Sequence, residues 1–210
     1  MKSNYHNEIT RLALEDQFSE SVLTSIVQAN TKQDRINLQI GHDHIHFDGS
    51  AFKSGFQYIA EQEQCLLNQI QIENFHHAWE ALGRITHSWQ DFFSHSNYVQ
   101  LWVEKHQNKT AEAIGVNDPD ILHHPSLSSG KSYIPIELLI LVPGVKTLIK
   151  PIIPKDSHAY MNLDSPASGQ FFYFAYWAAL KATKAACERI FQLIDHVDPN
   201  GKLVKQFKGK

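Results

Sequence analysis

The sequence predicts an all-α fold, a single-domain helical bundle with long loops. Apolar residues recur every three or four positions along several segments, which is the spacing that places them on one face of a helix. Strands are hard to find, because few runs alternate apolar and polar residues. The chain has 210 residues, enough for one well-buried domain. We therefore expect one domain over residues 1–210, in which residues 107–157 form an irregular insertion.

The first quarter of the chain is expected to form two short helices followed by a long loop. Residues 5–29 carry apolar side chains at helical spacing, and Ser19 or Ser21 is a candidate cap for the second helix. The periodicity is lost over residues 30–52, where Gly41 and Gly49 occur. Loops of that length are uncommon without a function, so we expect this one to lie across the surface and to carry a function.

Three long helices are expected in the rest of the chain. Two of them span residues 54–72 and 74–103, with a break near residues 91–95, and the last spans residues 168–196. Between them, residues 107–134 are rich in Asn, Asp, Pro, Ser and Gly, which is typical of irregular structure.

The following segment, IPIELLILVPGVKTLIKPIIP, is strongly apolar but carries one glutamate, two lysines and four prolines. These residues make it too broken to span a bilayer. A short helix and a turn packed into the core is the favoured interpretation, and an element that touches a membrane is the alternative.

Composition argues against a protein that binds polyanions through its overall charge, and it indicates a metal-binding protein. A net charge of −3 gives no broad attraction to nucleic acid or to an anionic membrane. Thirteen histidines are the outlier, and imidazole is the commonest neutral metal ligand. Cys65 and Cys187 are too few for a disulfide scaffold and are expected to be free. The start of the chain lacks the apolar core of a signal peptide, so we expect a cytoplasmic protein, one exported without a cleaved signal, or a trimmed mature form.

The run ALGRITHSWQDFFSHSNYV carries the sharpest chemical pattern. His87, Asp91 and His95 are spaced four apart, so on a helix they lie along one face and can converge on metal. The alternative is a solvated stripe on an amphipathic helix. Three donors in register, beside aromatic residues that pack the other faces, favour the metal site.

Three weaker patterns accompany it. The loop QDRINLQIGHDHIHFD gathers several potential ligands, although a surface loop can be polar for solubility alone. If that segment is extended, its alternate histidines share one side. HAYMNLDSP is also compatible with a capped helix start, and a single early histidine is weaker still. The residues concerned are Asp34, His42, Asp43, His44, His46 and Asp48 in the loop, then His158 and Asp164, and finally His6.

These residues together resemble a known superfamily: zinc-dependent phospholipase C enzymes, heterokaryon-incompatibility C proteins and single-strand-specific zinc nucleases. The spelling HxxQDFFSHSNYV is closest to the heterokaryon-incompatibility C branch and its bacterial phospholipase-like cousins. An early HxxIT at His6, an aspartate (Asp34) about a dozen residues before HFD, and HAxxNLDSP at His158 extend the resemblance, which runs from residue 6 to residue 164.

The resemblance implies a helical enzyme that binds two or three zinc ions (Zn²⁺) in a cleft. One zinc would be held by Asp34, His46, His87 and Asp91, with Asp91 bridging to another zinc. A second zinc would be held by His95, His158 and Asp164, and His6 would serve the bridged third. His44 is the alternative to His46, and Asn162 is the alternative to Asp164. Relatives usually offer an amino-terminal tryptophan to the third zinc, whereas no tryptophan precedes His6 here.

The expected function is therefore hydrolysis of a phosphodiester by a metal-activated water, most specifically a phospholipase C that cleaves phospholipid headgroups. Asp34 is the candidate general base, and residues 134–153 are the candidate membrane contact. One alternative is a single-strand nuclease that stacks bases on Tyr98, Trp102 or Trp89, although no stable nucleic-acid complex is expected from the charge. The other alternative is a non-catalytic, zinc-stabilised interaction or toxin-like protein.

Overall fold

A computed structural model of the chain describes residues 1–131, 133 and 154–210. Within these residues every regular element is a helix and no strand occurs; two isolated β-bridges join single residue pairs. The expected all-α class is confirmed. The apolar segment over residues 134–153, for which we expected a core plug or a membrane contact, lies outside the described residues.

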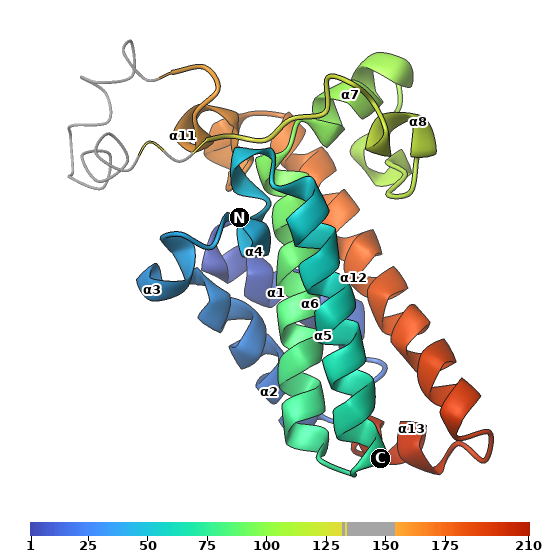
Figure 1. Cartoon of the computed structure of the whole chain (residues 1–210). Helices are drawn as coiled ribbons and strands as arrows, with labels where there is room; N and C mark the ends of the chain where they lie inside the picture. Colours follow the sequence, from blue (N-terminus) through green and yellow to red (C-terminus); the bar gives the residue numbers. More distant parts are fainter. Residues whose placement is uncertain (132, 134–153) are drawn as a thin grey trace.

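One long helix, α6 (Phe75–His95), forms the centre of the bundle. It packs against α2 (Glu20–Thr31), α5 (Phe52–Gln71) and α12 (Phe171–Val197). Helix α1 (Ser3–Leu14) packs against α12 and α2. Figure 1 shows the chain's N-terminus, α4 and α11 gathered at one end of the bundle, which is the end where α6 finishes. The polar residues of the C-terminal half of α6 therefore lie at that end.

Close packing between helices fixes how α2 crosses α6. Gly83 lies at the crossing, and a Cβ atom there would meet the carbonyl oxygen of Ile26 at 2.5 Å and the Cβ of Ala29 at 2.6 Å. The crossing therefore requires glycine at position 83, because both neighbours belong to the packed core and cannot move freely.

Helix α6 ends at His95, at the end of the range where the sequence predicted a break. Ser96 adopts an extended conformation with φ −93° and ψ 164°, and α7 (Tyr98–Lys105) begins two residues later. His87, Asp91 and His95 therefore lie on one uninterrupted helix.

The expectation of a single irregular surface loop before α5 is wrong. The segment forms four short helical turns: η1 (Lys32–Asp34), α3 (Ile36–Gln39), α4 (Asp43–His46) and η2 (Asp48–Ser50). Its end is buried, because the ring of Phe47 packs edge-on against Phe92 with centroids 5.2 Å apart. Because α4 is helical, His42, His44 and His46 do not share one side; His44 packs instead against His42 and Tyr58.

The remaining elements are short except for α12. After α7 come η3 (Ala111–Ala113) and α8 (Pro119–Leu122), and α11 (His158–Met161) and η5 (Pro166–Ser168) precede α12. The last helix, α13 (Lys202–Lys208), was not expected from the sequence; it lies between Gly201 and Gly209 and buries Phe207 against Phe18.

Two smaller expectations, on a helix cap and on the cysteines, can be compared with the structure. Ser19 takes the N-cap position of α2, but its hydroxyl makes no capping hydrogen bond. Cys65 and Cys187 are both free, as expected. Among the described residues, no helix is both long and apolar enough to cross a membrane.

Candidate metal centre

The polar face of α6 is buried at the end of the bundle. The side chains of His87 and Asp91 are 0% and 1% exposed, and that of His95 is 6% exposed. Burial of three ionisable side chains on one helix is costly unless each is paired or bound to a metal. The solvated-stripe alternative is therefore wrong.

The carboxylate of Asp91 is the centre of the first group of side chains. Its Oδ2 atom lies 2.8 Å from Nδ1 of His46 and 2.9 Å from Nε2 of His87, and these two nitrogens are 3.2 Å apart. Three potential ligand atoms thus form a small triangle. Ligand atoms on a tetrahedral zinc with bonds near 2.0–2.1 Å are separated by roughly 3.3 Å, so the triangle needs little expansion to accept the ion.

Two further residues approach the same group from the N-terminal elements. Nε2 of His6, on α1, lies 3.1 Å from the other carboxylate oxygen of Asp91, and Oδ1 of Asp34, on η1, lies 3.9 Å from Nε2 of His87. Ligand atoms of His6, Asp34, His87 and Asp91 all lie within 4.8 Å of one another. His46 contacts two of these four residues, so five side chains surround one position.

A second group adjoins the first through His95. Nε2 of His95 lies 3.4 Å from Oδ1 of Asp164 and 3.6 Å from Oδ1 of Asp91. Its other ring nitrogen, Nδ1, lies 3.2 Å from Oδ1 of Asp48, which is 2.7 Å from Nδ1 of His158. His95 therefore stands between the two groups, with one nitrogen facing Asp91 and Asp164 and the other facing Asp48.

The amine of Met1 lies at the junction of the two groups. It donates to Oδ1 of Asp91 at 2.7 Å and to Oγ of Ser94 at 3.0 Å, and it is 3.0 Å from Oδ1 of Asp164 and from Nε2 of His95. Burial opposes its charge, but Asp164 and Asp91 together raise the pKa of this amine to about 11. A positive charge thus occupies the space between the carboxylates.

The residues fit a metal because most of the histidines are fixed from behind. Nδ1 of His6 donates to Oε1 of Gln90, Nε2 of His46 donates to the carbonyl oxygen of Leu38, and Nδ1 of His95 donates to the carbonyl oxygen of His46. Metal-binding histidines characteristically use one ring nitrogen in this way, which leaves the lone pair of the other nitrogen for the ion.

A second observation supports the same fit. Nε2 of His6 faces Asp91, yet among the described residues it makes no hydrogen bond. Buried polar atoms without partners are rare in folded proteins and require an explanation. Convergence on a shared cation supplies one, and histidine with aspartate is a ligand set that zinc accepts.

Electrostatic interactions hold the group in mixed protonation states. Burial lowers the pKa of His87 to about 4, so this imidazole is neutral at pH 7. Burial opposes the charge on Asp91, but the Met1 amine, His95 and His87 hold its pKa well below the usual range. Burial and the Met1 amine also oppose charge on His95, yet Asp91 and Asp48 raise its pKa to about 10. His95 is therefore protonated in the metal-free protein, and a metal that binds there must displace this proton.

The two groups are not sealed from solvent. The side chains of Asp34, His158 and Asp164 are 17%, 24% and 28% exposed, in contrast to the nearly complete burial of Asp91. These three residues mark the open edge of the site, where a substrate or a water molecule can approach.

The structure brings all the predicted ligands into these two adjoining groups: His6, Asp34, His46, His87, Asp91, His95, His158 and Asp164. The alternatives lie differently. His44 is directed toward Tyr58, and Asn162 donates from its amide to Oδ2 of Asp164. Two further residues belong to the site. Asp48, which the sequence placed among the potential ligands of the loop without assigning it to a zinc, contacts both His95 and His158. Gln90, which contacts His6, was not predicted, and its only sequence signal is its place inside the HSWQD motif.

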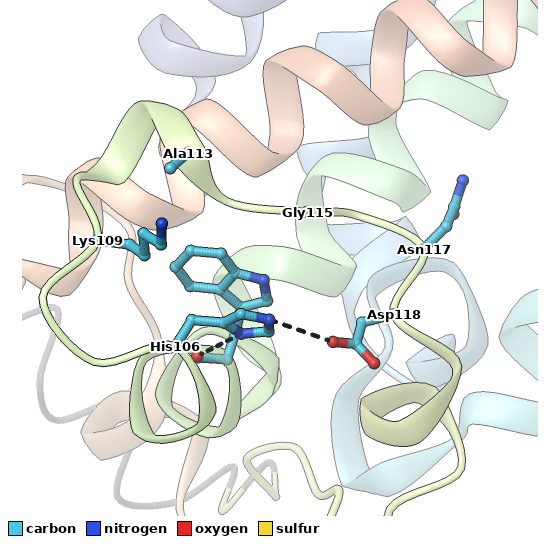
Figure 2. Close-up of a pocket in the computed structure, with 7 residues that line it drawn as sticks. His106, Lys109, Ala113, Gly115, Asn117 and Asp118 are labelled. Carbon is cyan, nitrogen blue, oxygen red and sulfur yellow. Dashed lines mark hydrogen bonds and ion pairs between the residues drawn. The ribbon is translucent and has the colours of Figure 1, made fainter.

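A surface cavity elsewhere in the molecule contains none of these residues. It has a volume of about 420 Å³ and lies between α7 and the segment that follows it, as Figure 2 shows. His106 in its lining stacks on Trp102 with ring centroids 4.5 Å apart, and Asp118 is paired with Lys105 at 2.8 Å. His106 and Asp118 already have partners, so we do not assign the cavity the chemistry of the metal centre.

The fold and the two buried histidine–aspartate groups define an all-α protein with a candidate metal centre. Residues 4–123 match the family described as the VWA7 N-terminal domain, and because this match covers more than half of the 210 residues, the chain belongs to that family. Neither the curated proteins nor the solved structures gave a match. The matched region includes His6 and all of α6, and it ends before His158 and Asp164.

Proposed function

We propose that this chain binds two or three zinc ions and hydrolyses a phosphodiester, with phospholipid headgroups as the substrate class. The observation that supports it best is the convergence of eight histidine and aspartate side chains, from segments 158 residues apart along the chain, on two adjoining positions. Adjacent divalent ions are the arrangement by which many hydrolases clamp a phosphate.

Zinc bound there supplies a water whose pKa falls toward about 7 and positive charge that neutralises the phosphodiester. The chain's own residues provide the rest. Asp34 stands at the open edge of the site, where the hydroxyl of Ser3 donates to its Oδ2 atom and leaves Oδ1 directed toward His87. A carboxylate in that position can accept a proton from a water at the edge, which is the role of a general base.

A lipid substrate is favoured over single-stranded nucleic acid for two reasons. The net charge of −3 gives no attraction to a polyanionic backbone. Two of the aromatic residues that a nuclease would use for stacking are also inaccessible, because Tyr98 is 0% and Trp102 is 4% exposed. Base stacking requires exposed ring faces.

A non-catalytic zinc protein is the second candidate, and one observation favours it. The side chains of His6, His87 and Asp91 are almost completely buried, as in sites where a metal holds a fold together. In this alternative, zinc stabilises the bundle and the partly exposed edge has no chemical role.

Incubation of the zinc-loaded full chain with vesicles of single phospholipids tests the proposal. We expect release of the phosphorylated headgroup together with diacylglycerol, and loss of the reaction after chelation. Asp34→Asn is expected to lower the rate by on the order of 10²–10⁴-fold, and metal analysis must show that its zinc content is unchanged. Asp43→Asn, an exposed change in the same loop, is the control.

Two other outcomes would each support one of the alternative functions. Zinc-dependent cleavage of single-stranded DNA without lipid hydrolysis would identify a nuclease. A fully zinc-loaded protein that is stabilised by the metal, yet is silent on every headgroup and on DNA, would support the non-catalytic candidate.

A further inference from the structure

Asp48 holds a position that none of the expected ligand roles explains. Its Oδ1 atom lies 2.7 Å from Nδ1 of His158 and 3.2 Å from Nδ1 of His95, so one carboxylate oxygen faces two imidazoles. Those two rings meet edge to face, with centroids 4.5 Å apart. The side chain of Asp48 is only 9% exposed, which leaves it little contact with solvent.

We propose that Asp48 is a positioning residue that accepts hydrogen bonds from Nδ1–H of both His95 and His158, and thereby presents Nε2 of both rings to the second metal position. This inference rests on the proposed function, because it assumes that a metal binds beside Asp164. Carboxylates behind metal-binding histidines fix the tautomer and the ring orientation in this way.

The hydrogen-bond partners of His95 argue against a direct metal bond from Asp48. Asp48, His95 and His158 offer ligand atoms within 4.8 Å of one another, so by distance alone they could hold an ion themselves. Nδ1 of His95, however, also lies 3.0 Å from the carbonyl oxygen of His46. A carbonyl oxygen only accepts hydrogen bonds, so Nδ1 carries a hydrogen and cannot be a ligand. Nε2, which faces Asp164 at 3.4 Å, is the nitrogen left for the metal.

The backbone around Asp48 is strained in a way that suits a fixed position. Phe47 and Ser50 have φ values of 57° and 60°, in the left-handed region that is unfavourable for residues other than glycine. Gly49, between them, has φ 58°. Strain of this kind persists only where surrounding contacts enforce it, and it is concentrated at functional sites.

Contacts on both sides of Asp48 enforce this conformation. The ring of Phe47 fills the space above Gly55, where a Cβ atom would approach it to 2.5 Å. The amide of Gly49 donates to the carbonyl oxygen of Gly130 at 2.8 Å, and a Cβ atom on Gly130 would lie 2.5 Å from Cα of His158. The turn that carries Asp48 is thus packed, through one glycine, directly against the backbone of its partner His158.

The test uses the full chain labelled with ¹⁵N-histidine and loaded with ¹¹³Cd in place of zinc, and it requires no substrate. Scalar coupling between cadmium and nitrogen identifies the ligating ring nitrogen, and His95→Ala and His158→Ala assign the signals. We expect coupling to Nε2 of both residues. Coupling to Nδ1 of either residue would overturn the inference, because that nitrogen would then bind the metal and could not donate a hydrogen bond to Asp48.

Asp48→Asn supplies the second measurement. We expect the variant to bind the same number of zinc ions at saturation, with the affinity of the second position weakened by about 10–100-fold, while Asp43→Asn changes neither quantity. Loss of one whole equivalent of zinc, together with the same change in the visible Co²⁺ spectrum as His158→Ala, would make Asp48 a ligand and overturn the inference. A wild-type chain that binds no metal would remove the proposed function itself, whereas a wrong coupling pattern on bound metal removes only the role of Asp48.

Discussion

Oδ2 of Asp91 and Nδ1 of His46 lie 2.8 Å apart, although 45 residues separate them in the chain. This contact joins the short turns that follow α2 to the central helix of the bundle. The atoms that hold the loop in place are therefore the same atoms that would bind the first metal. Where ligands and structural contacts coincide, metal binding and folding stability are linked.

His87→Ala should remove zinc from the first position and destabilise the fold. The imidazole is completely buried, stacked on His6 at 4.4 Å between ring centroids and 2.9 Å from Asp91, so its removal leaves a cavity and a buried carboxylate with one fewer partner. We expect a loss of about 3 kcal/mol in unfolding free energy, measured by urea denaturation of the zinc-loaded protein.

His77→Ala is the matched control for that change, because His77 lies on the same helix but is exposed. It should stay within about 0.5 kcal/mol of the wild type and keep all its zinc. Equal effects of the two substitutions would mean that His87 contributes no more than a surface histidine.

The stability of the metal-free protein should peak near pH 6.5. Burial lowers the pKa of His87 to about 4, below its unfolded value of 6.5, so the stability that this residue contributes is present above pH 6.5 and is lost as the pH falls toward 4. For His95, burial and the Met1 amine oppose the charge, but Asp91 and Asp48 raise the pKa to about 10. Its contribution is therefore complete below pH 6.5 and is lost as the pH rises toward 10.

Zinc should reverse the alkaline half of this profile. The metal takes the place of the proton on His95, so affinity and stability increase with pH until the histidines are fully deprotonated. Thermal unfolding between pH 6.5 and 9 should then show a falling melting temperature without zinc and a level or rising one with zinc. Slopes of the same sign in both series would show that His95 does not exchange a proton for the metal.

Gly83→Ala tests the packing of the bundle without touching the metal centre. In an open helix this change stabilises by about 1 kcal/mol, but here the new methyl group would lie 2.5 Å from the carbonyl oxygen of Ile26. Overpacking against backbone should outweigh the helical gain and destabilise the protein by about 1–3 kcal/mol. Lys184→Ala, an exposed change on α12, is the control and should be nearly neutral. A stabilised Gly83→Ala protein would show that α2 and α6 are farther apart.

Helical periodicity predicted the long elements well, because each of them buries one continuous apolar face. Helices α5 and α12 lie within a few residues of the expected bounds, and the helix expected over residues 74–103 is divided at the expected break into α6 and α7. The turns between α2 and α5 could not be predicted in the same way. Their conformation depends on Phe47, which is drawn into contact with Phe92 on another helix, and on φ values that local sequence does not reveal.

The candidate ligands could be named from the sequence because they fall in motifs with regular spacing or familiar spelling. The spacing of His87, Asp91 and His95 is itself a geometric statement, since i and i+4 share a helical face. The role of Asp48 could not be inferred from its position. It becomes visible only when a turn near residue 48 meets His158, which is 110 residues later.

Metal analysis of the purified full chain after dialysis against zinc tests the central claim most directly. The arrangement of His6, Asp34, His46, His87, Asp91, His95, His158 and Asp164 predicts two or three equivalents of tightly bound zinc, with at least one equivalent lost in His87→Ala. A folded wild-type protein that retains no zinc, cobalt or cadmium would contradict the account, because the buried histidines and aspartates would then serve only one another.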